Sequence, residues 1–455
     1  MYRYKTLFFL SILTVFSLSA VAQKGTQSPY SVFGLGELNN GQYAYFMSMG
    51  NALTANTDST IINQNNPASY AYVARFRPLF QVGLNGRFSK FSDANQSSNA
   101  RQLGLNQFQL AFPIKKNWGG SFGLTPFSST GYLITNSNIV GEDTISKTIN
   151  EGTGTVSQFH LGTAYKYKFK TSRLSVGANL RYVFGASNKI ESFEFVSYPG
   201  GALHSRVEKN TRVSSLTADF GMVYEKFFKK NSMSIGLTYS PSVKLNAHQD
   251  LLSYSYSESY YGNYSYFYGL VDTVEYLNNN KGSINLPSSY KLGFEYRIRP
   301  EKNSSQSYLI KLSGDVKYQE WSKYSETFGT ATNDSIFKNR LSSSFGIQYS
   351  PHVGRNANNN LIPWVGKLHY RLGFNYTLSQ IYINSTQLTN YGISFGLGIP
   401  VMVNNSNTSI NIGAKYGSFG TTKNNLIKEN YIGVYFGITI SPGIYDRWFL
   451  KRKYD

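Results

Sequence analysis

Cysteine is absent from this sequence of 455 residues, and charged residues make up only 15% of it. Without cysteine the chain forms no disulfide and carries no lipid anchor on a cysteine. The low charged fraction argues against an ordinary soluble domain, in which about 25% of residues are charged. Beyond the N-terminus no run of about 18 apolar residues occurs, so the sequence predicts no membrane-spanning helix.

The N-terminus has the pattern of a secretory signal peptide. Two basic residues precede an apolar core, Leu7 to Leu18, that is too short to span a bilayer. Ala20-Val21-Ala22 then fits a small-x-small cleavage site. The sequence therefore predicts a signal peptide over residues 1–22 and export from the cytoplasm. A buried N-terminal helix is the alternative interpretation.

Aromatic residues are abundant, at 16% of the chain with 37 tyrosines, and the formal net charge is +20. Tyrosine suits the membrane–water interface, because its ring contacts lipid headgroups while its hydroxyl stays hydrated. A strongly basic balance is common in nucleic-acid-binding proteins, but an exported protein does not meet nucleic acid. The expected partners are therefore outer-membrane lipids and lipopolysaccharide, and a basic surface that only keeps the protein soluble is the simpler interpretation.

The C-terminal part shows an alternation that recurs along the chain. Ile432, Val434 and Phe436 are each followed by a glycine or a tyrosine, so apolar and other side chains point to opposite faces of a strand. An apolar face toward lipid and a polar or small face toward a lumen are typical of transmembrane β-barrels. Fourteen such strands are predicted, at residues 79–90, 103–114, 117–127, 154–168, 172–185, 211–224, 232–245, 287–299, 307–320, 339–350, 366–380, 389–400, 408–418 and 427–440. The predicted fold class is an all-β, 14-stranded antiparallel transmembrane β-barrel.

Connections between the predicted strands alternate in length. Short turns are predicted near Lys115, Lys170, Lys229, Ser304 and Asn405, with a somewhat longer one on the same side around Arg355. Longer connections are predicted around Asn95, Asn138, Tyr198, Tyr261, Ser325, Thr386 and Lys423. An even strand count puts both chain ends on one side, so both termini are expected in the periplasm of a Gram-negative cell, with the longer connections outside. A soluble β-sandwich is the alternative, but it needs no such alternation.

Three segments make up the predicted mature chain. Residues 23–78 lack strand alternation and are long enough to form an N-terminal hatch that plugs the lumen. Residues 79–440 form the barrel, which is expected to be monomeric, and residues 441–455 form a basic periplasmic tail. The stretch Tyr254–Tyr268 is rich in Tyr and Ser. It is interpreted either as an adhesive outer loop or as an extension of the flanking strands.

Several short motifs lie before and within the predicted barrel. Met49-Gly50-Asn51-Ala52 and Asn65-Asn66-Pro67-Ala68 precede the first strand, and Leu286-Pro287, Asp315 and Trp321-Ser322 lie far downstream. Together they resemble motifs of the FadL-type family of outer-membrane transporters of hydrophobic compounds, over essentially the mature chain. The resemblance implies a barrel with a hatch that lets hydrophobic, fatty-acid-like molecules cross the outer membrane passively.

The mature start, Tyr30 to Glu37, and the basic tail depart from that family. They resemble a branch of exported barrels from the Bacteroidota, and members of the wider family also serve in type IX secretion as barrels that shuttle cargo. The alternative function is therefore a scaffold or shuttle in a surface protein-secretion machine, with a machine or surface protein as partner. A ligand-sized apolar pocket between hatch and wall would favour transport, whereas a sealed polar lumen would favour the scaffold.

Two sets of residues are candidates for the function of the interior. The hatch set is Gly34, Gly36, Gly50, Asp58, Asn66, Pro67 and Ala68. The charged residues predicted on the inward face are Arg173, Arg181, Asp219, Lys291, Glu295, Arg297, Lys311, Asp315, Lys317, Arg371 and Lys415. Their excess of positive charge predicts ion pairs with the hatch, through Glu37 or Asp58, or attraction of an anionic group such as a carboxylate. Solvated charges in a water-filled lumen are the simpler interpretation.

Pro126 lies near the predicted end of the third strand. Proline donates no ladder hydrogen bond, so within sheets it occurs at edges, bulges or strand ends. In the FadL-type family an interruption of the third strand makes a lateral opening into the bilayer, which the resemblance places at Pro126. A plain strand end is the alternative.

Catalysis has little support in the sequence. The five histidines, His160, His204, His248, His352 and His369, form no metal-ligand spacing. No Ser/His/Asp set is recognisable. The sequence therefore predicts a protein that is not an enzyme and that uses no cofactor or metal, and an outer-membrane hydrolase is the alternative.

Overall fold

The computed structural model describes residues 26–39, 43–140, 143–196, 202–261, 265–300, 307–329, 331–333, 337–352, 363–401 and 408–441. The predicted signal peptide, all but the first residue of the predicted tail, and the connections predicted at Tyr198, Ser304, Arg355 and Asn405 lie outside these ranges.

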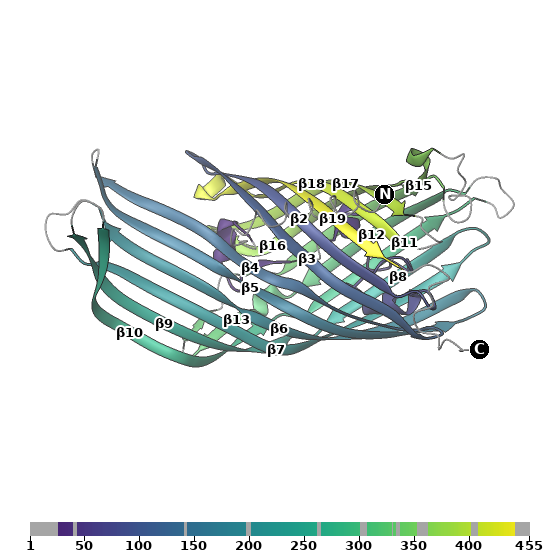
Figure 1. The fold of residues 1–455 in the computed structure, drawn as a ribbon, viewed down its shortest axis with the longest axis horizontal. Helices are drawn as coiled ribbons and strands as arrows, with labels where there is room; N and C mark the ends of the chain where they lie inside the picture. The colour runs from purple at the N-terminus through teal and green to yellow at the C-terminus, as the bar shows by residue number, and fades with distance from the viewer. Residues whose placement is uncertain are drawn as a thin grey trace, which may run out of the picture.

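Fourteen antiparallel strands form a closed barrel (Figure 1). The barrel closes where its last strand pairs with its first, with Phe436 opposite Leu84. The barrel strands are β2 (Leu79–Ser92), β3 (Ser97–Lys115), β4 (Trp118–Val140), β5 (Asp143–Lys168), β6 (Ser172–Phe195), β7 (His204–Phe227), β8 (Ser232–Ser240), β11 (Ser289–Ile298), β12 (Leu309–Gln319), β15 (Arg340–Ser350), β16 (His369–Ile383), β17 (Thr386–Val401), β18 (Thr408–Gly420) and β19 (Lys428–Ile440). The predicted fold class is confirmed.

Part of the sheet continues beyond one end of the barrel as a curved wall, on the left in Figure 1. β9 (Val243–Tyr261) continues β8 past Pro241, and β10 (Ser265–Leu286) leads into β11 across Pro287. β9 pairs with β7 and β10, and the far parts of β4 to β7 complete the sheet. We call this sheet the long wall. Its end of the barrel is the long end, and the opposite end is the short end.

The loops predicted around Asn138 and Tyr261 are wrong, because the structure shows strand in both places. β4 and β5 are separated only by residues 141–142, and β9 and β10 only by residues 262–264. Of the two interpretations of Tyr254–Tyr268, the structure shows the strand extension. On the outer face of β7, Leu216 is followed toward the long end by polar residues such as Arg212, so the apolar alternation stops although the backbone ladder continues.

Shorter elements lie between the barrel strands. They are η4 (Trp321–Lys323), β13 (Ser325–Phe328), β14 (Ala331–Asn333), η6 (Trp364–Lys367) and η7 (Lys423–Asn425). β13 pairs with β10 and β14, so the connection between β12 and β15 folds against the long wall. Among the described residues, no helix is long and apolar enough to cross a membrane.

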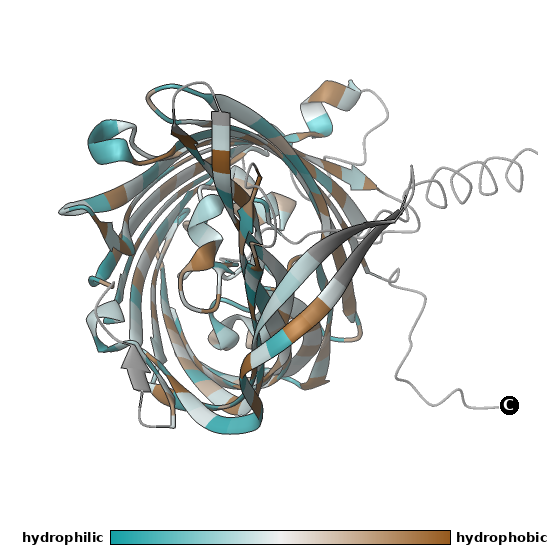
Figure 2. Cartoon of the chain, turned by 90° about the vertical axis from the view of Figure 1, so that its left-hand side faces the viewer, coloured by the Kyte–Doolittle hydropathy of each residue, from teal (hydrophilic) through white to brown (hydrophobic). Residues whose placement is uncertain are grey.

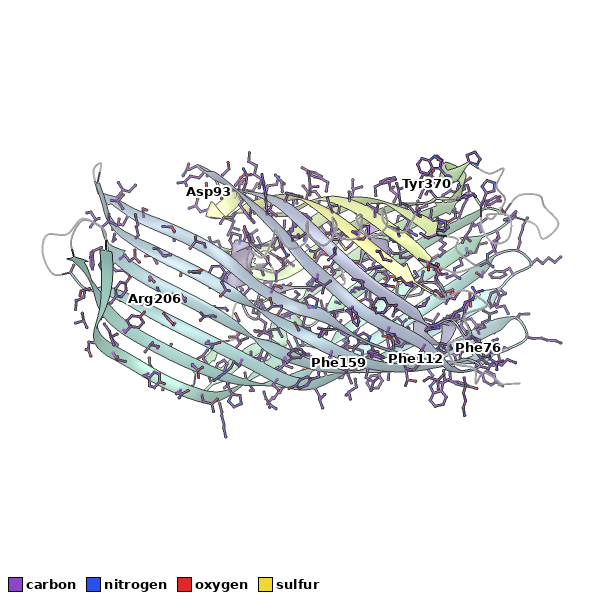
Figure 3. The ribbon with its side chains drawn as sticks, in the orientation of Figure 1. Phe76, Asp93, Phe112, Phe159, Arg206 and Tyr370 are labelled. Carbon is purple, nitrogen blue, oxygen red and sulfur yellow. The ribbon has the colours of Figure 1, made fainter. Side chains whose placement is uncertain are left out.

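The outer face of the barrel is apolar and the inner face is polar. Phe159, Leu292 and Phe374 are exposed on the outside, and Phe159 points away from the barrel in Figure 3. Residues of the opposite parity, such as Gln158 beside Phe159, are buried toward the interior. This distribution fits lipid around the barrel and a polar lumen.

The N-terminal segment lies inside the barrel, where Figure 2 shows short helical turns surrounded by the strands. Its elements are η1 (Pro29–Val32), β1 (Glu37–Leu38), α2 (Ala44–Ser48) and η2 (Pro67–Tyr72). η2 packs against β5, β6 and β7, whereas α2 packs against β17, β18 and β19. A Cβ on Gly177 of β6 would lie 2.7 Å from the carbonyl carbon of Pro67, so glycine is required for this close approach.

Substitutions of two adjacent residues of β16 test which face of the barrel wall meets lipid. Phe374→Arg places a charge on the lipid side and should cost about 2–4 kcal/mol of folding stability if it lies at mid-membrane depth. Asn375→Arg places the same side chain toward the internal cavity that Asn375 lines, and should cost much less. Unfolding in guanidinium after refolding into lipid vesicles measures both values. Equal destabilisation by the two variants would contradict the assignment of faces.

Candidate functional site

Residues 43–72 form a plug that hydrogen bonds fix to the barrel wall. Asp315 of β12 accepts hydrogen bonds from the backbone nitrogens of Leu53 and Thr54, each at 2.9 Å, and from the Thr54 hydroxyl at 2.7 Å. Asn56 Nδ2 donates to Glu295 of β11 at 3.0 Å. Carboxylates that accept several bonds from one segment hold it in a single position.

Asp58 ties the plug to the same side of the barrel. Its carboxylate lies 2.5 Å from Lys311 Nζ, and that lysine is almost fully buried. Burial alone would raise the pKa of Asp58, but the nearby charges of Lys311 and Arg297 hold this pKa below its usual range. The ion pair therefore stays charged. Arg371 of β16 stacks over the Tyr45 ring of the plug at 4.1 Å.

The predicted Asn-Pro-Ala turn starts η2. The Asn66 side chain accepts a hydrogen bond from the nitrogen of Ala68 at 3.1 Å and donates to Thr54 O at 2.7 Å. Pro67 occupies the first turn of η2, and the hydroxyl of Ser175 in β6 donates to Ala68 O at 2.7 Å. The turn thus links two parts of the plug to each other and to the wall.

The barrel wall is split between β3 and β4. Their ladder stops at the pair Phe108–Leu124, while β3 continues its pairing with β2, and β4 with β5, far toward the long end. We call this gap the seam. Pro126 lies at its start, next to a bulge in β4 between Pro126 and Ser128. β4 continues to Val140, so a plain strand end at Pro126 is wrong.

Residues 26–39, which we call the crosspiece, bind the free edge of β4 in the seam. β1 extends the ladder by two residues, with Leu38 opposite Ser128. The nitrogen of Gly131 in β4 donates to the Ser31 hydroxyl at 3.0 Å. A Cβ on Gly131 would lie 1.9 Å from a crosspiece carbonyl oxygen, so a side chain there would displace the crosspiece.

The crosspiece also contacts the other sides of the barrel. Gln27 Nε2 donates to a backbone carbonyl of β3 at 3.0 Å, and Tyr30 Oη donates to a carbonyl next to β19 at 2.6 Å. Lys189 Nζ of β6 donates to the carbonyl of Gly34 at 2.9 Å. Gly34 and Gly36 adopt φ values of +56° and +94°, which favour glycine. The crosspiece thus spans the interior near the long end.

Arg87 of β2 joins the crosspiece to the wall. Its guanidinium lies 2.7 Å from Glu37 and 2.8 Å from Glu429 of β19. Burial alone would raise the pKa of Glu37, but Arg87 and a hydrogen bond from Thr26 hold this pKa below its usual range. Arg87 therefore forms ion pairs with two carboxylates that approach from different elements.

A cavity of about 290 Å³ is lined by both the plug and the crosspiece. Asn51 and Gln64 of the plug and Asn39 of the crosspiece contribute to it, and Pro126 and Phe127 bring it to the seam. Basic lining residues outnumber acidic ones. The basic ones are Arg87, Arg181, Lys291, Lys317, Arg340 and Lys415, and the acidic ones are Glu37, Asp219 and Asp315. The lining is mainly polar, so the cavity differs from the apolar pocket that a purely hydrocarbon ligand would need.

The charged residues predicted on the inward face lie in several environments. Those that contact the N-terminal segment are Arg181, Glu295, Lys311, Asp315 and Arg371. Those that pair with another wall residue are Arg173 with Glu225, Asp219 with Arg181, Lys291 with Asp315, and Arg297 with Glu295. Lys415 lies over the Tyr431 ring, and neither it nor Lys317 has an acidic partner among the described residues. The structure thus offers both ion pairs with the plug and unpaired positive charge.

Sequence reasoning missed several charged residues of the interior, which include Arg87, Lys166, Lys189, Glu225, Arg340 and Glu429. Strand parity was the available signal, because Arg87 shares the parity of Asn85 and Gln81 on the inward face of β2. Among the described residues, no three acidic or histidine side chains are grouped so as to hold a metal ion.

A closed 14-stranded antiparallel barrel with an apolar outer face is the architecture of outer-membrane β-barrel proteins. The family model described as BamG matches residues 4–455, and the chain belongs to this BamG family. A search of curated proteins found no match.

Solved structures share the fold at low identity. The CymD monoaromatic hydrocarbon channel is 14% identical with a TM-score of 0.51, covering 89% of this chain and 98% of that one. The Ralstonia pickettii toluene transporter TbuX is 12% identical with a TM-score of 0.54, covering 88% and 98%. A Pseudomonas aeruginosa FadL homologue is 12% identical with a TM-score of 0.53, covering 90% and 100%. The expected FadL-type fold is confirmed.

The contacts of Asp315 predict how firmly the plug is attached. Asp315→Ala removes the acceptor for Leu53 and Thr54 and leaves Lys291 without its carboxylate, at a cost of about 3–5 kcal/mol. The loosened plug should admit ions, seen as larger and more frequent single-channel openings in planar bilayers. Asp250→Ala, in a partly exposed pair on the long wall, is the control and should leave conductance unchanged. A closed Asp315→Ala channel would contradict the role of this anchor.

Proposed function

We propose that this protein is an outer-membrane channel through which hydrophobic and amphipathic small molecules pass between the cavity and the bilayer by way of the seam. The observation that carries the proposal is the end of the β3–β4 ladder at Phe108 and Leu124 beside a cavity that Pro126 and Phe127 line. The passage is passive and includes no catalytic step.

The seam suits the entry or exit of a molecule with an apolar part. Leu103 and Leu105 of β3 and Leu124 of β4 are exposed on the outer face near it. Two strand edges in lipid would leave backbone groups without partners, which costs several kcal/mol per group. The crosspiece supplies part of the missing partners to β4, so its displacement is the step that would open the seam.

The polar lining of the cavity favours substrates that have a polar head group as well as an apolar part. An apolar chain would leave through the seam, while a polar head group would meet the basic and amide side chains of the lining. Fatty-acid-like molecules have this form, and hydrocarbons without a head group do not. In this proposal the barrel is monomeric, lies among outer-membrane lipids and lipopolysaccharide, and has its long end outside and both termini in the periplasm. The expected Bacteroidota branch also belongs to the proposal.

A disulfide that fixes the crosspiece to β4 in the seam tests the proposal, because the native chain has no cysteine. Leu38 and Ser128 are directly opposite each other in the β1–β4 ladder, a separation that a disulfide spans. The variant Leu38→Cys/Ser128→Cys should, when oxidised, reduce uptake of a hydrophobic fluorescent dye by intact cells to the level of cells without the protein. Reduction of the disulfide should restore uptake.

Thr211→Cys/Gln249→Cys is the matched control, since it joins two strands of the long wall that are already paired. Its oxidation should leave uptake unchanged. Undiminished dye uptake by cells with the oxidised Leu38→Cys/Ser128→Cys variant would contradict the proposal that the seam is the route.

A scaffold or shuttle role is the second candidate, and the long wall favours it. Among the described residues, the part of β10 from Gly269 to Lys281 pairs with β9 on one side and with no strand on the other. Leu270, Val274 and Tyr276 are exposed there. A partner of a surface protein-secretion machine would dock on such a surface. Cells that need the protein but tolerate the oxidised seam disulfide would support this role over transport.

A further inference from the structure

Basic side chains crowd the inner face of three neighbouring strands, β11, β12 and β15. Lys291 of β11 lies directly opposite Lys317 of β12 in the ladder. Arg340 of β15 lies opposite Gln319, two residues along β12 from Lys317 and on the same face. Like charges directly opposite in a sheet destabilise it. The arrangement therefore needs negative charge close by.

The protein supplies that charge only to Lys291. Asp315 lies 3.4 Å from Lys291 Nζ, but it already accepts three hydrogen bonds from the plug. Within the described part of the chain, Lys317 and Arg340 have no carboxylate within 4 Å, and Glu37, which influences Arg340 from farther away, is paired with Arg87. Lys311 and Arg297, by contrast, each have such a partner, and Lys415, which lies on β18 away from these three strands, has none within the described residues.

Unused hydrogen-bond donors accompany the unpaired charges. Arg340 Nε and Trp321 Nε1 are buried without a partner among the described residues. Trp321 is only 5% exposed. Both residues and Lys317 line the cavity. A buried donor without an acceptor is costly, so a group with several acceptor oxygens and negative charge would relieve both deficits.

We propose that Lys317, Arg340 and Trp321, which we call the basic pocket, bind a phosphate group in the cavity. A phosphate monoester carries about −1.5 to −2 charges at pH 7, which matches two unpaired cations, whereas a carboxylate carries only one. Its oxygens accept the paired donors of a guanidinium together with those of lysine and tryptophan. The group belongs either to a lipid head group that enters through the seam or to a free phosphate compound.

This inference deepens the proposed function, because it names the head group that the channel would take. The two remain separable. Phosphate binding is an equilibrium measured on the purified barrel, whereas the seam disulfide measures dye uptake by cells. If phosphate does not bind, the dye-uptake result still tests the transport route, and if the disulfide has no effect on uptake, the titration still tests the phosphate site.

Calorimetric titration of the full barrel in a detergent with an uncharged head group tests the basic pocket. The probes are inorganic phosphate, dihexanoyl phosphatidic acid and dihexanoyl phosphatidylcholine. Binding of phosphatidic acid alone identifies a lipid source, and binding of inorganic phosphate identifies a free one. Phosphatidylcholine carries no net charge and should bind at least tenfold more weakly than the better of the other two probes. Lack of binding by both phosphate and phosphatidic acid overturns the proposal.

Variants locate the site. Lys317→Gln and Arg340→Gln should each weaken binding about tenfold or more, whereas Lys317→Arg keeps the charge and should bind within a few-fold of wild type. Lys415→Gln is the matched control, because Lys415 lines the same cavity without an acidic partner but lies on β18. Heat-dependent mobility in gels checks that each barrel is folded. Equal weakening by Lys415→Gln and Lys317→Gln would mean that binding depends on the overall positive charge of the cavity. That result would overturn the proposal that the basic pocket is the binding site.

Discussion

Every backbone N–H and C=O at membrane depth needs a hydrogen-bond partner within the protein, because the hydrocarbon core holds no water. The barrel meets this requirement by closing β19 onto β2. At the seam the strands do not supply all the partners, since the β3–β4 ladder stops at Leu124. The crosspiece takes over part of that task on β4. Its position therefore decides whether the wall is closed at this point.

The plug and the crosspiece differ in how strongly they are held. The plug depends on buried carboxylates and on the buried ion pair of Asp58 with Lys311. Breaking a buried pair costs about 3–5 kcal/mol. The crosspiece has one such link, Glu37 with Arg87, in which the Glu37 side chain is 33% exposed. Its other polar contacts are mostly hydrogen bonds to neutral groups, each worth about 0.5–1.5 kcal/mol net. Tyr30 and Leu35 also bury apolar surface against the barrel. Because the crosspiece has fewer charged anchors than the plug, we expect it to move at the lower cost.

The sequence predicts the fold because alternation in strands such as β19 records which face meets lipid. The sequence does not predict how far the strands of the long wall extend. Beyond Leu216 in β7 the outer face is polar, so the lipid-facing alternation that marks a barrel strand stops, although Val213 is still buried on the inner face. The interior was only partly predictable. Strand parity places Arg181, Lys311 and Asp315 toward the lumen, but their partners come from a segment more than a hundred residues away. The docking of the crosspiece on β4 has no signal in a single sequence, because it depends on where a neighbouring strand diverges.

Hydrogen–deuterium exchange of the barrel in lipid nanodiscs tests most directly whether the crosspiece is the movable part. The measured quantity is the exchange rate of backbone amides, resolved by mass spectrometry to short peptides. The account predicts that residues 31–39, together with Gly131 of β4, exchange much faster than residues 158–165 of β5 and the plug residues Leu53 and Thr54. Equal protection of the crosspiece, the β4–β5 ladder and the plug would contradict it, because the seam would then be a fixed part of the wall.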